Sequence, residues 1–319
     1  MTAHGRSGGW SAWVGLALFV VVVAALTIGV GPAGLTRGGL AQVLEFRLPR
    51  LVLGIMAGGV LATAGAGLQG LLRNPLADPF TLGVASGAAL GVSLVLVSGH
   101  GSSLLLPVGG FAGALAATFL VYLLARVRGR VTMTGLVLAG VIANFFFASL
   151  MMLIMILGRR TLGEAVYLTM GHLGVVVTHR SVWLLAGAGA AALAGCGWLL
   201  TQSRALDVMS LSEETARSLG VNTGRLTRQV FVVLSLAVGV VVSFTGAISF
   251  VGLVVPHLVR MLFGPMHRRV LPGSFLLGAG VLLVSDLVAR NVVPGGLPLS
   301  VVTALVGVPF FVYLLRKRL

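Results

Sequence analysis

Polar residues interrupt the apolar stretches of this chain at two related places. The first break is RNPLADP at 73–79, where two prolines, an arginine and an aspartate separate two long apolar runs. The second lies in GAISFVGLVVPHLVR at 246–260. Hydrocarbon does not tolerate unpaired backbone groups, so each break must be packed in protein or line a water-filled path. The pattern predicts a membrane protein with irregular segments held inside a helical bundle.

The composition supports the membrane assignment. Of the 319 residues, 57% are hydrophobic and only 9% are charged, and the mean hydropathy is +1.07. These values exclude an ordinary soluble domain and indicate several spans. The first apolar run, about 12–30, lacks a signal-peptide cleavage pattern and is predicted to be a span. Cys196 is the single cysteine, which excludes a disulfide framework and a Cys-rich metal site.

We predict an all-α membrane protein with about ten transmembrane helices in a single domain that covers residues 1–319. A straight span needs about 20 residues, so the short segment at 251–263 is predicted to be a partial helix inside the bundle. The predicted segments are 11–30, 48–71, 80–98, 104–125, 132–157, 181–201, 229–247, 251–263, 271–290 and 299–316.

The positive charge predicts how the chain is oriented. The net charge is +15, but the arginines lie in short loops between apolar runs, so membrane orientation explains them better than nucleic-acid binding. With the N-terminus inside, most of the 22 basic residues fall on the inner side. The positive-inside rule therefore places both termini in the cytoplasm.

The two broken segments also suggest an internal repeat. GAGLQGLLRNPLADP at 65–79 is similar to GAISFVGLVVPH at 246–257, and each follows a long apolar span. In the predicted topology the first of these spans runs inward and the second runs outward. The two halves are then inverted relative to each other, which is typical of transporters.

The largest inner loop covers about 202–228. Ser212 can cap a short helix that begins SEETARSLG, because Glu213 and Glu214 then lie in the first turn, where the helix dipole favours them. Gly220 would end this helix. We interpret it either as a docking surface for a cytoplasmic partner or as a solvated loop.

Six motifs resemble the FecCD permease family, the transmembrane subunits of importers driven by ATP-binding cassette (ABC) proteins. They cover most of the chain in the family's order and spacing. They are RLPRLVLGIMAGGVLATAGAGLQGLLRNPLADPFTLGVASGAALG (47–91), LVLAGVIAN (136–144), LSEETARSLGV (211–221), GAISFVGLVVPHLVR (246–260), HRRVLPGSFLLGAGVLLVSDLVAR (267–290) and LPLSVVTALVGVPFFVYLL (297–315).

The resemblance implies a type II ABC importer permease in the bacterial inner membrane. The implied partners are a second permease copy, identical or paralogous, two ATP-binding subunits and an extracytoplasmic binding protein. The implied cargo is a metal chelate, with ferric siderophore first, then cobalamin, then haem. The chain contains no G-x-x-x-x-G-K-[ST] motif, so we expect it to be no enzyme and to bind no cofactor, with ATP and Mg used by the partner.

The resemblance also assigns three groups of residues. The first group resembles the family's coupling helix and consists of Ser212, Glu213, Glu214, Ala216, Arg217, Leu219 and Gly220. Ser212 stands where the family usually has glycine. The second group would bind glutamates of the binding protein and consists of Arg47, Arg50 and Arg290. The alternative is that these arginines extend along the membrane edge to keep their charges in water. The third would line or close the path, between the fifth and tenth helices: Asn74, Pro75, Thr132, Met133, Thr134, Pro256 and His257.

Several residues allow other interpretations. Asp286 lies four residues before Arg290, so the two can pair on one helix face, or Asp286 could serve a proton-coupled secondary transporter. His257 could be a metal ligand, but no second ligand lies at the required spacing. Asn74 and Asp78 could cap the following helix or contact the path. An outer loop contains Tyr167, Met170, His172 and His179. These side chains could contact haem iron, or they could form an ordinary surface.

Overall fold

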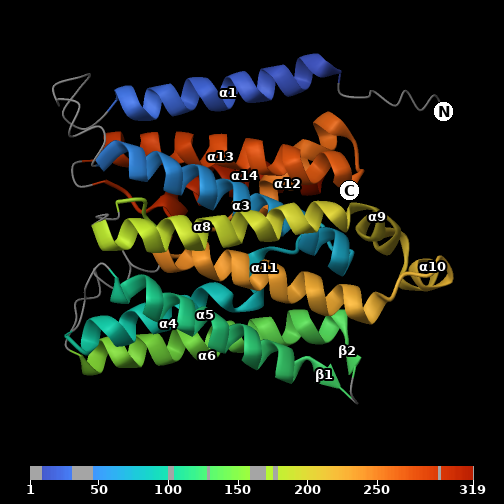
Figure 1. The fold of residues 1–319 in the computed structure, drawn as a ribbon, viewed down its shortest axis with the longest axis horizontal. Helices are drawn as coiled ribbons and strands as arrows, with labels where there is room; N and C mark the ends of the chain where they lie inside the picture. The colour runs from blue at the N-terminus through green and yellow to red at the C-terminus, as the bar shows by residue number, and fades with distance from the viewer. Residues whose placement is uncertain are drawn as a thin grey trace.

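The structure, a computed structural model, is an all-helical bundle in which long helices lie roughly parallel or antiparallel (Figure 1). It describes residues 9–30, 46–99, 104–127, 130–158, 170–174, 179–293 and 296–318. In chain order the elements are α1 (Trp10–Gly29), α3 (Leu48–Leu72), the 3-10 helix η2 (Pro79–Leu82), α4 (Val84–Val97), α5 (Leu105–Leu124), β1 (Arg126–Val127), β2 (Arg130–Val131), α6 (Met133–Leu157), α8 (His179–Thr201), α9 (Ser203–Leu211), α10 (Glu213–Ser218), α11 (Thr223–Thr245), α12 (Val251–Phe263), α13 (His267–Val292) and α14 (Leu299–Arg318).

The described residues contain the ten apolar helices that were predicted. Seven are long and apolar enough to cross a membrane, and three further apolar helices are shorter. The short ones are α4, α12 and the Leu299–Tyr313 part of α14. The prediction that 251–263 is a partial helix is confirmed, since α12 has 13 residues. The all-α membrane fold with about ten helices is therefore confirmed.

The arrangement of a long helix, an irregular segment and a short helix occurs twice. Helix α3 ends at Arg73, which adopts a left-handed conformation with φ of 51°, and η2 and α4 follow. Helix α11 ends at Gly246, and α12 begins after Phe250, which has φ of 67°. Figure 1 shows α3 and α11 running in opposite directions, as an inverted repeat requires.

Small residues hold the centre of the bundle together. Nearly all of α3 is buried, between α11, α12 and α13. At Gly58 an added Cβ would overlap the carbonyl of Gly278 on α13, and at Gly65 it would overlap the carbonyl of Gly252 on α12. These glycines let the helix backbones touch directly, which is a main source of packing in membranes.

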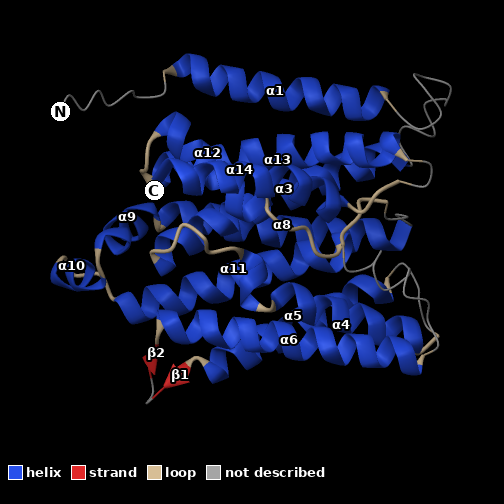
Figure 2. Ribbon diagram, turned by 180° about the vertical axis from the view of Figure 1, so that it is seen from behind, coloured by secondary structure: helices blue, strands red, loops and turns tan. Residues whose placement is uncertain are grey.

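The short helices α9 and α10 and the β-hairpin lie at one end of the bundle. Figure 1 and the opposite view in Figure 2 both show α9, α10 and the β1–β2 hairpin together at this end. Helix α1 begins and α14 ends there as well. We call it the α10 end, and the other the opposite end.

Candidate functional site

The α10 end contains the predicted helix at 211–221. Ser212 is the N-cap, and its Oγ accepts a hydrogen bond from the backbone N–H of Thr215 at 2.8 Å. Gly220 has φ of 83° and closes the helix, with its N–H donating to Arg217 O at 3.0 Å. The prediction of a capped helix that starts after Ser212 and ends at Gly220 is thus confirmed.

The two glutamates of α10 have different surroundings. Glu213 accepts from Arg217 one turn later and from the hydroxyl of Thr223 at 3.3 Å. Glu214 is exposed, as is Leu219. Ala216 is fully buried and fixes α10 against its neighbours. Helix α10 therefore presents Glu214 and Leu219 outward, while Glu213 holds the start of α11.

Helix α9, which the sequence analysis did not predict, connects this loop to the bundle. Asp207 on α9 accepts two hydrogen bonds from His267 at the start of α13, one from the backbone N–H at 2.8 Å and one involving the ring Nδ1 at 2.7 Å. Partial burial raises the pKa of the Asp207 carboxyl, but these bonds from His267 outweigh it and leave the pKa below its usual value. The carboxylate is thus stabilised where α9 meets α13.

Gln69 links the two broken segments. Its side-chain NH₂ group lies near three backbone carbonyls, Ala77 O at 3.3 Å in the first break and Gly252 O and Leu253 O at 3.3 and 3.2 Å in α12. Its Oε1 accepts from the guanidinium of Arg260. One buried amide therefore connects backbone carbonyls of the first break and of the start of α12.

In the first break Asp78 caps the following helix η2, as predicted, whereas Asn74 bonds within the loop. Asn74 Oδ1 accepts from the N–H of Leu76 at 2.9 Å, and Asp78 Oδ1 accepts from the N–H of Phe80 at 3.2 Å. Pro75 is exposed on the loop. The structure thus gives Asn74 and Asp78 a structural role, while their contact with a substrate path stays a prediction.

The predicted inner gate lies at the start of α6. Thr132 is the N-cap of this helix and accepts from the N–H of Gly135 at 3.1 Å. Thr132 and Thr134 are exposed, and Met133 contacts Arg73 at the end of α3 with an Nη2–Sδ distance of 3.8 Å. Pro256 is buried within α12, with His257 half-buried beside it. Their role as a gate stays a prediction.

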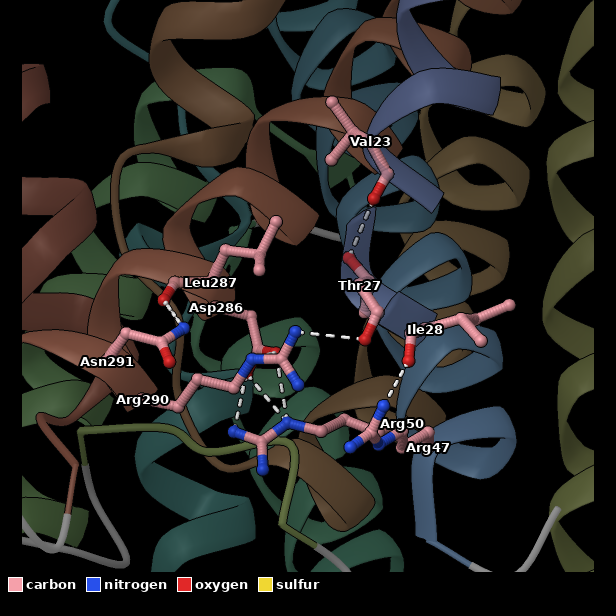
Figure 3. A network of polar contacts seen from close by, with 9 residues as sticks. All are labelled: Val23, Thr27, Ile28, Arg47, Arg50, Asp286, Leu287, Arg290 and Asn291. Carbon is pink, nitrogen blue, oxygen red and sulfur yellow. Dashed lines mark hydrogen bonds and ion pairs between the residues drawn. The ribbon is translucent and has the colours of Figure 1, made fainter. Parts of the chain in front are cut away.

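Two of the three predicted docking arginines, Arg50 and Arg290, flank one buried carboxylate, Asp286, at the opposite end (Figure 3). Arg50 donates to Asp286 from Nε at 3.0 and 2.9 Å and from Nη2 at 2.7 Å. Arg290 lies farther away, with Nε 3.7 Å from Asp286 Oδ2, a distance too long for a hydrogen bond. Asp286 is fully buried, whereas the Arg50 side chain is 27% exposed.

Arg290 and the third predicted docking arginine, Arg47, hold the end of α1. Arg290 Nη2 donates to Thr27 O at 3.0 Å, and Arg47 Nη1 donates to Ile28 O. The last carbonyls of a helix lack internal partners and carry partial negative charge, so cations are favourable there. Arg290 and Arg47 thus tie α1 to α13 and α3. The Arg290 side chain is only 6% exposed, and docking by these residues stays a prediction.

The structure describes the side chains of only two of the four possible haem contacts, Met170 and His172. Tyr167 lies outside the described residues, and so does the side chain of His179. His172 donates its backbone N–H to Thr245 O at 2.7 Å, and Met170 is exposed nearby. Among the described residues, no three His, Cys, Asp or Glu side chains form a group that could hold a metal ion.

These features define a multi-span permease with paired breaks, a capped helix at one end and an arginine cluster at the other. The sequence matches the FecCD transport family over residues 14–317, so the chain belongs to this family, whose members are permease subunits of ABC transporters.

Among its relatives are the cobalamin import system permease protein BtuC of Halobacterium salinarum and the hemin transport system permease protein HmuU of Yersinia pestis. The first is 40% identical over 87% of this chain and 74% of its own length. The second is 38% identical over 86% of this chain and 82% of its own length. The Fe(3+)-citrate import system permease protein YfmD of Bacillus subtilis is also 38% identical, over 86% of this chain and 81% of its own.

A solved structure supports the same assignment. It is described as an inward-facing conformation of an ABC transporter assigned to the metal-chelate type, and it has a TM-score of 0.84 and 32% identity over 95% of this chain and 98% of its own. The alternative of a proton-coupled secondary transporter is not supported, since the family is that of ABC permeases and the described structure closes Asp286 between two arginines.

Proposed function

We propose that this chain carries a metal chelate inward across the cytoplasmic membrane of a bacterium. The observation that carries the proposal is the family match over nearly the whole chain, together with the repeated arrangement of long helix, break and short helix. Relatives named for cobalamin, hemin and Fe(3+)-citrate support bulky iron or cobalt chelates as the substrate class. Ferric siderophore is our first candidate, followed by cobalamin and then haem.

A second permease copy, identical or paralogous, would complete the path. Helices α6 and α14 expose large apolar side chains, including Phe145 at 73% and Ile142 at 53% on α6 and Leu305 at 68% on α14. Apolar surface of this kind suits a helix interface or lipid. We propose that α6 and α14 of two copies face each other, with the gate residues Thr132, Met133 and Thr134 at the inner end of the path.

Two ATP-binding subunits would supply the energy, using ATP and Mg²⁺ that this chain does not bind. We propose that α10 docks into them through the exposed Glu214 and Leu219. The α10 end then lies in the cytoplasm, as the distribution of basic residues also favours. The rigid packing of Ala216 and the caps at Ser212 and Gly220 would let α10 transmit motion to α11.

An extracytoplasmic binding protein would deliver the chelate to the opposite end. Arg50 is fixed by Asp286 but remains partly exposed, so its guanidinium is oriented in advance for a partner carboxylate. Arg47 and Arg290 would add positive charge around it, which speeds the encounter with an acidic surface.

Reconstitution tests this function. The chain is placed in proteoliposomes with ATP-binding subunits and a candidate binding protein, and uptake of a labelled ferric siderophore, cobalamin and haem is compared. Concentrative uptake of one chelate only in the presence of ATP and both partners would support the proposal. Uphill uptake by the chain alone on a proton gradient, or ATP-driven uptake restricted to a small unchelated ion, would overturn it.

A further inference from the structure

A cleft opens at the α10 end between helices that are distant in the sequence. Its volume is about 440 Å³, and its lining residues come from the end of α3 and the loop after it, the end of α9, the last turns of α12 and the start of α13. Arg73 and Arg260 line it, as do His257 and His267. The cleft is separate from the exposed surface of α10 that the proposed function assigns to the ATPase.

The cleft is lined by basic side chains. The lining holds two arginines and two histidines, and none of the described residues that line it is a carboxylate. Asp207 pairs with Nδ1 of His267, while the buried Nε2 of that ring has no hydrogen-bond partner among the described residues. The guanidinium of Arg260 bonds to a neutral amide, Gln69, rather than to an acid. Positive charge of this kind, partly shielded from water, favours an anion.

An apolar surface adjoins this basic cleft. Met261 is 61% exposed, Leu262 55% and Met266 60%. Met261 and Leu262 lie in the last turn of α12, and Met266 directly precedes α13. A soluble anion such as phosphate gains nothing from these side chains. A lipid does, because its headgroup can enter the cleft while its acyl chains cover the apolar residues.

We propose that this cleft binds the phosphate headgroup of an anionic phospholipid from the membrane leaflet at the α10 end. Arg260 and Arg73 contact the phosphate, and the acyl chains lie over Met261, Leu262 and Met266. Basic pockets between transmembrane helices on the cytoplasmic side are suited to such headgroups. The bound lipid joins α3, α12 and α13 next to α9, which leads into α10, so lipid composition would affect the stability of the coupling loop.

Lipid retention and thermal stability test this site. The full-length chain, alone and assembled with its ATPase subunits, is purified, stripped of lipid and mixed with phosphatidylglycerol, phosphatidylcholine or inorganic phosphate. Bound lipid is counted by native mass spectrometry, and the unfolding midpoint is measured in parallel. Arg260→Gln keeps a group that can bond to Gln69, and Arg268→Gln is the matched control, since Arg268 is exposed at the same end but does not line the cleft.

We expect phosphatidylglycerol to bind and to raise the midpoint, and Arg260→Gln to weaken its binding about fivefold, which corresponds to about 1 kcal/mol per basic residue at an anionic surface. Arg268→Gln should bind like the wild type. Equal losses in both variants would overturn the proposal. So would an equal stabilisation by inorganic phosphate, which would identify a soluble-anion site, or loss of the lipid on assembly with the ATPase subunits.

Discussion

Asp286 on α13 and Arg50 on α3 form a bidentate ion pair although 236 residues separate them. Because Asp286 is fully buried, removing it leaves Arg50 and Arg290 without their carboxylate, and removing Arg50 leaves the carboxylate with only the more distant Arg290. The pair also orients Arg50 at the surface that we assign to the binding protein.

Asp286→Ala should therefore destabilise the fold by about 3–5 kcal/mol, the usual cost of breaking a buried pair. The double variant Asp286→Leu with Arg50→Met should lose less than Asp286→Ala, because only Arg290, and not both arginines, is then left without the carboxylate. Denaturation in nanodiscs measures the free energy of unfolding of both variants. A mild effect of Asp286→Ala, together with loss of proton-driven uptake, would instead indicate a proton-carrying role.

Neutralising Arg47 and Arg50 together, as Arg47→Gln with Arg50→Gln, should weaken capture of the binding protein, and more strongly at low salt, where charges are less screened. Glutamine avoids placing a second carboxylate against Asp286. Surface-immobilised binding protein gives the affinity at several salt concentrations, with Arg268→Gln at the α10 end as the control. An unchanged affinity would mean that Arg47 only anchors α1 and that Arg50 only pairs with Asp286.

Gly65→Ala should destabilise the bundle by roughly 1–3 kcal/mol, because its Cβ would overlap the Gly252 carbonyl and push α3 away from α12. Gly187 on α8 offers the matched control, since nothing lies within 4 Å of the Cβ that Gly187→Ala adds. That variant should be neutral or more stable by about 0.5–1 kcal/mol, from helix propensity. Similar unfolding midpoints for Gly65→Ala and Gly187→Ala would contradict the close approach of α3 to α12 at Gly65.

Asp207 should make stability depend on acid pH. Its pKa is lowered in the folded protein, so its contribution is complete above the ordinary value of 3.8 and is lost as the pH falls through the lower folded value. The unfolding midpoints of wild type and Asp207→Asn should thus differ at pH 7 and converge below about pH 4. If the two unfolding midpoints differed by the same amount across this pH range, the Asp207–His267 bond would stabilise the fold independently of the charge on Asp207.

The sequence predicted the bundle well because hydropathy and the two breaks are local signals. The start of α11 was wrong by six residues, at Thr223 instead of 229, since its polar first turn extends beyond the apolar run and is capped by Asn222. Helix α9 was missed for a related reason, because its charged and polar residues gave no apolar run. Hydropathy finds membrane segments and not the aqueous ends of helices.

The polar contacts that connect distant helices were harder to predict. The i, i+4 spacing favoured Asp286 with Arg290, but the closer partner is Arg50, which no spacing rule identifies. Gln69 carried no signal in the sequence, since its role depends on the position of α12 beside α3. Such contacts follow from tertiary packing, whereas the cap at Ser212 follows from neighbouring residues and was predicted correctly.

Changes in α10 should separate ATP hydrolysis from transport. Glu214→Lys reverses an exposed charge without breaking a described contact, whereas Glu213→Lys also removes the bonds to Arg217 and Thr223. Ala216→Pro removes the N–H that donates to Ser212 O at 3.0 Å and breaks the helix. All three should insert normally, and Glu214→Lys should keep the wild-type unfolding midpoint.

In each case we expect ATP hydrolysis by the assembled complex to continue while uptake falls at least about tenfold, equivalent to 1.4 kcal/mol of lost coupling. The measurement is the ratio of chelate transported to phosphate released in proteoliposomes. Glu214→Gln is the matched control, because it removes the charge without reversing it and should give an intermediate ratio. A wild-type ratio in both Glu214→Lys and Ala216→Pro would place the contact with the ATPase elsewhere, and α9 would be the next segment to test because Asp207 ties it directly to α13.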